Sequence, residues 1–64
     1  MIKILTKGDP IYIDPKSVKM MLIYGLERGG QLKIMFKDGS DFTFFSCEVL
    51  TSLEKLADTI CENS

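Results

Sequence analysis

The residues that could support catalysis or metal binding are few, and their spacing argues against an enzyme. The chain of 64 residues has no histidine, the side chain most often used as a general base or metal ligand. Cys47 and Cys61 have no base beside them in the sequence that would activate a thiol. Asp38 and Asp41 flank Gly39, where acidic residues are typical of a turn rather than of an acid–base pair. The glycine pattern matches no phosphate-binding loop. We therefore predict a protein that is not an enzyme, with no catalytic residues, no metal site and no cofactor.

The two cysteines and the N-terminal segment indicate the compartment. Two cysteines are too few for the disulfide framework of a small secreted domain. We interpret them as buried, reduced thiols; the alternative, a pair that oxidises, depends on their Cα separation. The N-terminus lacks the apolar centre and cleavage site of a signal peptide, and no apolar run approaches the roughly 20 residues of a membrane span. The sequence predicts a cytoplasmic protein that is complete from Met1.

Composition and charge predict one small domain that spans residues 1–64. Apolar residues make up 45% and charged residues 27% of the chain, which is an ordinary globular balance. At this length the core alone gives marginal stability. Seven of the eight basic residues precede residue 38, whereas six of the nine acidic residues follow residue 37. This asymmetry fits either a surface that attracts an anionic partner or two solvated surfaces that neutralise each other.

Turn residues divide the first two thirds of the chain into extended segments. Gly8-Asp9-Pro10 separates a first strand, predicted over 3–6, from a short strand over Ile11–Ile13. Asp14 followed by Pro15 is typical of a helix start, and we expect a single turn there. The apolar run 19–26 fits either a helix or a strand, and the glycines after it favour a strand that enters a hairpin.

The parity of the loops predicts how the strands pair. A three-residue loop over Lys37-Asp38-Gly39, with Gly39 in the left-handed conformation of a bulge, places Ile34 opposite Phe42 and Leu32 opposite Phe44. A two-residue loop would split the apolar side chains between the two faces. A three-residue loop over 28–30 places Leu22 opposite Phe36. One face of the sheet would then bear these apolar side chains: Leu22, Tyr24, Leu26, Leu32, Ile34, Phe36, Phe42 and Phe44.

A C-terminal helix is expected to cover that face. Thr51 and Glu54 have the spacing of a capping box at the start of a helix. An apolar stripe follows with helical spacing. Its members are Leu53, Leu56, Ala57, Ile60 and Cys61. The predicted fold class is therefore α+β: an antiparallel sheet of about five strands, made of two hairpins plus a meander, with one C-terminal helix packed on one face.

The opposite face of the sheet is the candidate interaction face. In the predicted register it bears Met21, Ile23, Lys33, Met35, Lys37 and Phe45. If nothing covers it, an apolar surface of this kind is typical of a protein-binding site, and a symmetric homodimer is one form that such binding takes. Alternatively, the N-terminal hairpin folds over this face and closes a small barrel. Lysines beside an aromatic ring on a sheet also fit a nucleic-acid-binding regulator.

The order of these features is similar to that of the small FlbD-type flagellar accessory proteins. The matching stretches are 1–6, Ile13-Asp14-Pro15, Lys37-Asp38-Gly39 and 53–57. Small bacteriophage regulators resemble the chain equally. The resemblance implies a small bacterial or phage accessory protein and transfers no functional residue. We therefore predict a non-catalytic protein that binds a protein partner or a second copy of itself, with nucleic-acid binding as the alternative and no association with membranes.

Overall fold

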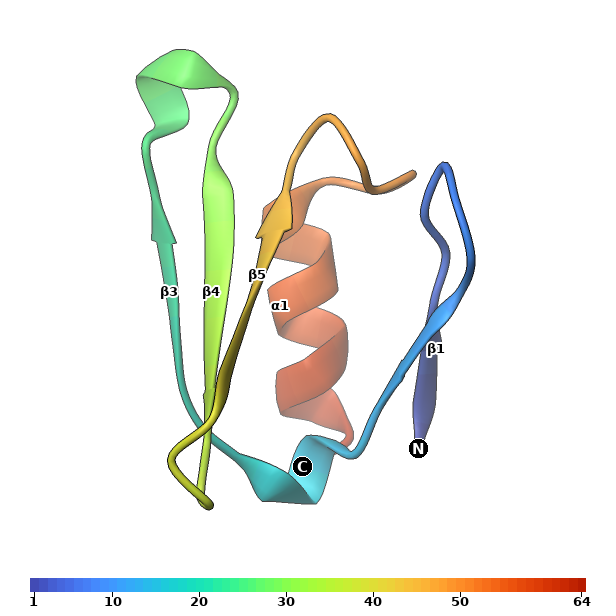
Figure 1. Cartoon of the computed structure of the whole chain (residues 1–64), viewed down its shortest axis with the longest axis vertical. Coiled ribbons are helices and arrows are strands. Elements are labelled where there is room, and N and C mark those ends of the chain that lie inside the picture. Colours follow the sequence, from blue (N-terminus) through green and yellow to red (C-terminus); the bar gives the residue numbers. More distant parts are fainter.

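Two antiparallel sheets and one helix make up the fold, which we describe from a computed structural model of all 64 residues (Figure 1). The elements in chain order are β1 (Ile2–Ile4), β2 (Ile11–Ile13), the 3-10 helix η1 (Pro15–Ser17), β3 (Val18–Tyr24), the 3-10 helix η2 (Leu26–Arg28), β4 (Gln31–Phe36), β5 (Asp41–Phe45) and α1 (Leu53–Glu62). The predicted α+β class with one C-terminal helix is confirmed. The five strands divide into a β1–β2 hairpin and a three-stranded sheet of order β3-β4-β5.

The turn between β4 and β5 has the predicted three-residue form. The backbone N–H of Gly39 donates to the carbonyl of Phe36 over 3.0 Å, and the N–H of Phe36 donates to the carbonyl of Ser40 over 2.9 Å. Gly39 has a φ of 93°, the left-handed conformation that the bulge requires. The predicted pairs Leu32–Phe44 and Ile34–Phe42 are both present. This part of the register is therefore confirmed.

The connection between β3 and β4 is longer than predicted, and this changes the faces of β3. Tyr24 pairs with Gln31, so the loop covers 25–30, contains η2, and begins at Gly25 with a φ of 69°. The predicted three-residue loop is wrong, and the register differs from the prediction by an odd number of residues. Because side chains alternate along a strand, each β3 side chain from Met20 to Tyr24 lies on the face opposite to the predicted one.

The corrected register moves Met21 and Ile23 from the candidate face into the inner side of the sheet. Ile23 pairs with Leu32 and Met21 pairs with Ile34, and both side chains pack against the core. Leu22 and Tyr24, which were predicted to be core residues, lie on the outer face and are exposed.

Helix α1 covers the inner face, as predicted, but begins one residue later than the capping box suggested. Ser52 is the N-cap, and its Oγ accepts a hydrogen bond from the backbone N–H of Lys55 over 3.1 Å. Leu53, Leu56 and Ile60 of the stripe are buried. Cys61 is exposed at the end of the stripe. The structure contains no helix with the length and apolar character needed to cross a bilayer.

One apolar core joins the helix, the inner face of the sheet and the N-terminal hairpin. Leu32 and Ile34 of β4 have no exposed surface, and Ile60 of α1 is almost as deeply buried. Ile4 and Ile13 of the hairpin belong to the same cluster. An isolated bridge between Thr6 and Val49 ties the hairpin to the segment before α1. In Figure 1 the helix lies between the hairpin and the three-stranded sheet. The hairpin therefore packs on the helix side and leaves the outer face of the sheet uncovered.

Candidate interaction face

The outer face of the three-stranded sheet is formed by side chains that alternate with the core residues. Cross-strand pairing arranges them in three rows, each with one residue from β3, β4 and β5. We call this surface the open face. Its rows are Tyr24, Gln31 and Phe45; Leu22, Lys33 and Thr43; and Met20, Met35 and Asp41.

Large apolar side chains dominate the open face although no element of the chain covers it. The exposed fractions are 47% for Met20, 46% for Leu22, 45% for Tyr24 and 41% for Phe45, and Met35 is half-buried between its neighbours. Neighbouring strands are about 4.8 Å apart, so side chains in adjacent rows and strands form a contiguous surface. Contiguous apolar surfaces of this kind mark interaction sites in small proteins.

The charges on the open face are one lysine and one aspartate. Lys33 lies in the middle row of the central strand, between Leu22 and Thr43. Asp41 lies at the edge of the last row, beside Met35. The centre of this apolar surface is therefore cationic, and its two formal charges cancel.

The structure brings together half of the predicted interaction residues and separates the others. Lys33, Met35 and Phe45 lie on the open face as expected. Met21 and Ile23 face inward, for the reason given above. The residues that the sequence reasoning missed are Met20, Leu22 and Tyr24, together with Gln31 and Asp41. The one sequence signal for the β3 register is the glycine at 25, which permits the left-handed conformation that ends β3 before Leu26, but Gly29 and Gly30 permit other loop lengths.

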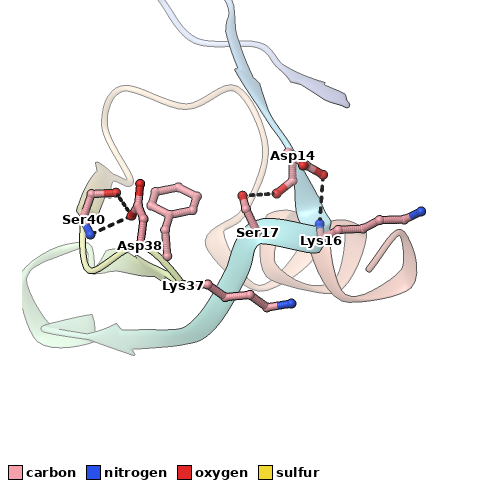
Figure 2. Close-up of a pocket in the computed structure, with 7 residues that line it drawn as sticks. Asp14, Lys16, Ser17, Lys37, Asp38 and Ser40 are labelled. Carbon is pink, nitrogen blue, oxygen red and sulfur yellow. Dashed lines mark hydrogen bonds between the residues drawn. The ribbon is translucent and has the colours of Figure 1, made fainter.

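Lys37 directly follows β4, beyond the last row of the open face, at a corner formed by η1 and the β4–β5 turn (Figure 2). Its backbone N–H donates to the carbonyl of Ser17 over 2.8 Å and so joins the two segments. Asp14 Oδ1 accepts from the backbone N–H of Lys16 over 3.1 Å, and Ser17 Oγ donates to the Asp14 carbonyl over 2.8 Å. The two bonds made by Asp14 are local turn and cap interactions. Lys37 is therefore outside the three rows that cross-strand pairing defines, and its place on the candidate face stays a prediction.

Asp38 stabilises the turn at the same corner. Its Oδ1 accepts hydrogen bonds from the Ser40 hydroxyl over 2.6 Å and from the Ser40 backbone N–H over 2.9 Å. Both bonds favour the ionised carboxylate and lower the pKa of Asp38 below its usual value. The bond from the Ser40 hydroxyl has the larger effect and the bond from the backbone N–H the smaller one. In Figure 2 the Lys16 and Lys37 side chains extend away from this carboxylate. The hollow at this corner, of about 560 Å³, is thus an open surface depression beside a turn whose carboxylate already has its partners.

Both cysteines are free and exposed, so the interpretation as buried thiols is wrong. Cys47 follows β5 in the connection to α1, and Cys61 lies on the last turn of α1. No group of three or more histidine, cysteine or acidic side chains has an arrangement that would hold a metal ion.

Comparisons with protein-family models, curated proteins and solved structures gave no match. The resemblance to the FlbD-type proteins therefore stays a prediction. The geometry of the open face is the feature of the molecule that bears on its function.

Proposed function

We propose that the chain is a small non-catalytic protein that acts by binding another protein through its open face. The observation that supports this most directly is the group of exposed apolar side chains on three paired strands, namely Met20, Leu22, Tyr24 and Phe45. Leaving these side chains in water costs free energy that a partner would recover by covering them. An accessory protein of bacterial or phage origin, working in the cytoplasm, fits a domain of this size.

The charge distribution indicates the chemistry of the partner. Lys33 is at the centre of the open face, so a partner that buries this face has to provide a carboxylate or carbonyl oxygens for its ammonium group. Two copies of the chain packed face to face about a central two-fold axis would place Lys33 against Lys33 of the other copy. The open face therefore fits a different protein with an apolar surface and a central acidic residue.

The methionines suit this role because they adapt to the shape of a partner. Met20 and Met35 are cross-strand neighbours in the last row. Their side chains are unbranched and flexible, and such side chains are common on surfaces that fit a partner by repacking.

Comparative affinity capture tests the proposal. The wild type and the Met35→Glu, Phe45→Glu and Lys37→Glu variants are immobilised and exposed to the same lysate of the native host. We expect a partner that the wild type and Lys37→Glu retain and that both open-face variants lose, because a buried glutamate on an apolar interface is strongly unfavourable. Lys37→Glu is the control, since it places a negative charge outside the three rows of the open face. Equal retention by all four proteins would remove the open face as the binding site.

Nucleic-acid binding is the second candidate, and the corrected register provides an observation in its favour. Tyr24 and Phe45 flank Gln31 in the first row, and Lys33 lies in the row beside them. Exposed aromatic rings on a sheet stack with bases, and a nearby lysine neutralises phosphate. Asp41 on the same face and the net charge of −1 weigh against it.

Oligonucleotide titration separates the two candidates. Binding of single-stranded RNA or DNA that weakens with added salt and with Tyr24→Leu or Lys33→Gln would favour this second function. An absence of binding at low salt would leave protein binding as the function of the open face.

A further inference from the structure

The outer edge of β3 has a row of backbone groups without partners. β3 is the first strand of the order β3-β4-β5 and pairs only with β4. Outside that ladder the Val18 backbone N–H donates to the Pro15 carbonyl, and no other backbone or side-chain hydrogen bond of the structure involves residues 18–24. In an antiparallel strand about half of the N–H and C=O groups point away from the paired neighbour. The edge of β3 is therefore a template on which another strand can pair.

The usual protections of an exposed edge are confined to the first residues of β3. A bulge between Val18 and Met20 displaces Lys19, which is the only charged residue of the strand. The remainder, Met20 to Tyr24, contains no charge, proline or glycine. Long uncharged apolar edges are rare in monomeric proteins because they associate with other strands.

We propose that two copies of the chain pair through β3, antiparallel and about a two-fold axis at Leu22. In this arrangement Leu22 lies opposite Leu22 of the second copy, and Met20 lies opposite Tyr24. On the inner side, Met21 lies opposite Ile23. The product is a continuous six-stranded sheet. This pairing uses the backbone edge, so it does not depend on what binds the open face.

The second copy is favoured as the occupant because β3 is complementary to itself in this register. Every cross-strand pair from 20 to 24 joins two apolar side chains, which is the favourable case. The only charged residue, Lys19, falls opposite Gly25 of the second copy, so no like charges meet.

The other edge of the sheet is less suited to self-pairing. Strand β5 has five residues against the seven of β3 and begins at Asp41. Symmetric pairing about Thr43 would place that carboxylate opposite Phe45 of the second copy. A single usable edge per chain gives a closed dimer rather than an open fibre.

The dimer enlarges the open face. The β3 side chains of both copies, Met20, Leu22 and Tyr24, would lie side by side at its centre, with the two Lys33 residues on the neighbouring strands. Two strands of seven residues bury less area than a standard stable interface. We therefore expect a dissociation constant in the micromolar range, about 1 to 100 µM.

Mass measurements over a concentration series test whether the dimer exists. Sedimentation equilibrium of the wild type should show a change from one to two chains as the concentration rises towards about 1 mM. Hydrogen exchange at the same concentrations should show that amides of β3, and not those of β5, become more protected in the dimer. A single chain mass up to about 1 mM would overturn the proposal.

A pair of double variants tests the register. Met20→Lys with Tyr24→Lys places like charges opposite each other twice in the dimer, whereas Met20→Lys with Tyr24→Glu places opposite charges there. Replacing repulsion by attraction in one cross-strand pair is expected to change the dissociation constant roughly fivefold, so with two such pairs the dissociation constants of the variants should differ by about 25-fold. The two residues are four positions apart, about 13 Å along one strand, so their interaction within a single chain is small. Equal dissociation constants would overturn the register about Leu22.

Met35→Glu separates this dimer from packing of two open faces. Met35 lies on the central strand, away from the β3 edge, and its substitution should leave the dimer mass unchanged while abolishing capture of a partner. Conversion of Met35→Glu to a single chain mass would refute edge pairing and identify the open face as the dimer contact. Loss of partner capture by Met35→Glu without any wild-type dimer would support the proposed function and refute this inference.

Discussion

Two neighbouring substitutions in β3, Leu22→Asp and Ile23→Asp, should differ strongly in how much they destabilise the fold. Both replace a branched aliphatic residue with the same short acid in the same strand, so their backbone preferences nearly cancel. The structure places Ile23 on the inner face opposite Leu32 and Leu22 on the open face opposite Lys33. Because successive side chains point to opposite faces, the pair reports the register directly.

The expected cost of Ile23→Asp is comparable to the whole stability of the domain. Removing a fully buried isoleucine side chain costs about 2 to 5 kcal/mol, and Ile23 is half-buried against the core, so roughly half of this applies. The new carboxylate would enter a cluster whose nine buried members are all apolar. Such a group costs at least a further ~2 kcal/mol without a partner. The total, about 4 kcal/mol, compares with roughly 3 to 10 kcal/mol for a chain of 64 residues.

Leu22→Asp should change stability by no more than about 1 kcal/mol. The side chain it removes is 46% exposed, and the lost contacts with its neighbours are worth roughly 1 kcal/mol. The new carboxylate remains in water and lies opposite Lys33, which returns about 0.2 to 1 kcal/mol as a cross-strand ion pair.

Urea denaturation followed by circular dichroism measures both values, at a concentration low enough to keep the chain monomeric. We expect Leu22→Asp to shift the urea midpoint only slightly. We expect the Ile23→Asp protein to be largely unfolded even without urea. The three-residue loop over 28–30 would place Leu22 inside and Ile23 outside. A folded Ile23→Asp variant together with an unfolded Leu22→Asp variant would therefore refute the register of β3.

Three further substitutions test local features of the turns and the helix. Gly39→Ala should lower the free energy of unfolding by about 1 to 2 kcal/mol in urea denaturation, because φ is 93° there and no neighbouring atom would clash with the new Cβ. Ser52→Ala should cost about 1 kcal/mol and Thr51→Ala close to nothing, because only Ser52 caps α1. Ser40→Ala should raise the pKa of Asp38 towards 3.8 in an NMR titration. Because folding lowers this pKa, the carboxylate stabilises the wild type above pH 3.8 and loses that effect as the pH falls through its lowered pKa, and Ser40→Ala should weaken this acid dependence.

The β4–β5 hairpin could be predicted from the sequence because several constraints agree there. Leu32 and Ile34 alternate with Lys33, so the sequence itself shows which face of β4 is buried. The Asp38-Gly39 pair then limits the turn to a few forms, and only one parity keeps Phe44 on the same face. Lys33, Met35 and Phe45 of the open face followed from the same reasoning, whereas Gln31 and Asp41 at the ends of these strands were missed.

Strand β3 could not be assigned in this way because its sequence has no alternation. Residues 20–24 are apolar without interruption, so neither face is distinguished by polarity. The register then depends on the loop length, and three glycines between 25 and 30 allow several lengths. The structure uses all three in the left-handed region, at φ values of 69°, 93° and 91°. Tertiary packing decides the outcome: the branched side chain of Ile23 packs inward beside Leu32, and the ring of Tyr24 remains outside.

The open face is uncovered because a chain of this length has only two elements that could cover a sheet, and both pack on the inner side. Helix α1, with ten residues, spans the inner face, and its buried stripe uses Leu56 and Ile60 for that purpose. The β1–β2 hairpin is the only other element available, and Ile4 and Ile13 are buried in the same core. Moving the hairpin to the open face would cover the apolar side chains there but would expose part of this core. Burial of apolar surface gained on one face would be lost on the other. The outward-facing apolar residues of β3, Met20, Leu22 and Tyr24, therefore have no covering element within the chain, and this is the physical reason to look for their partner outside it.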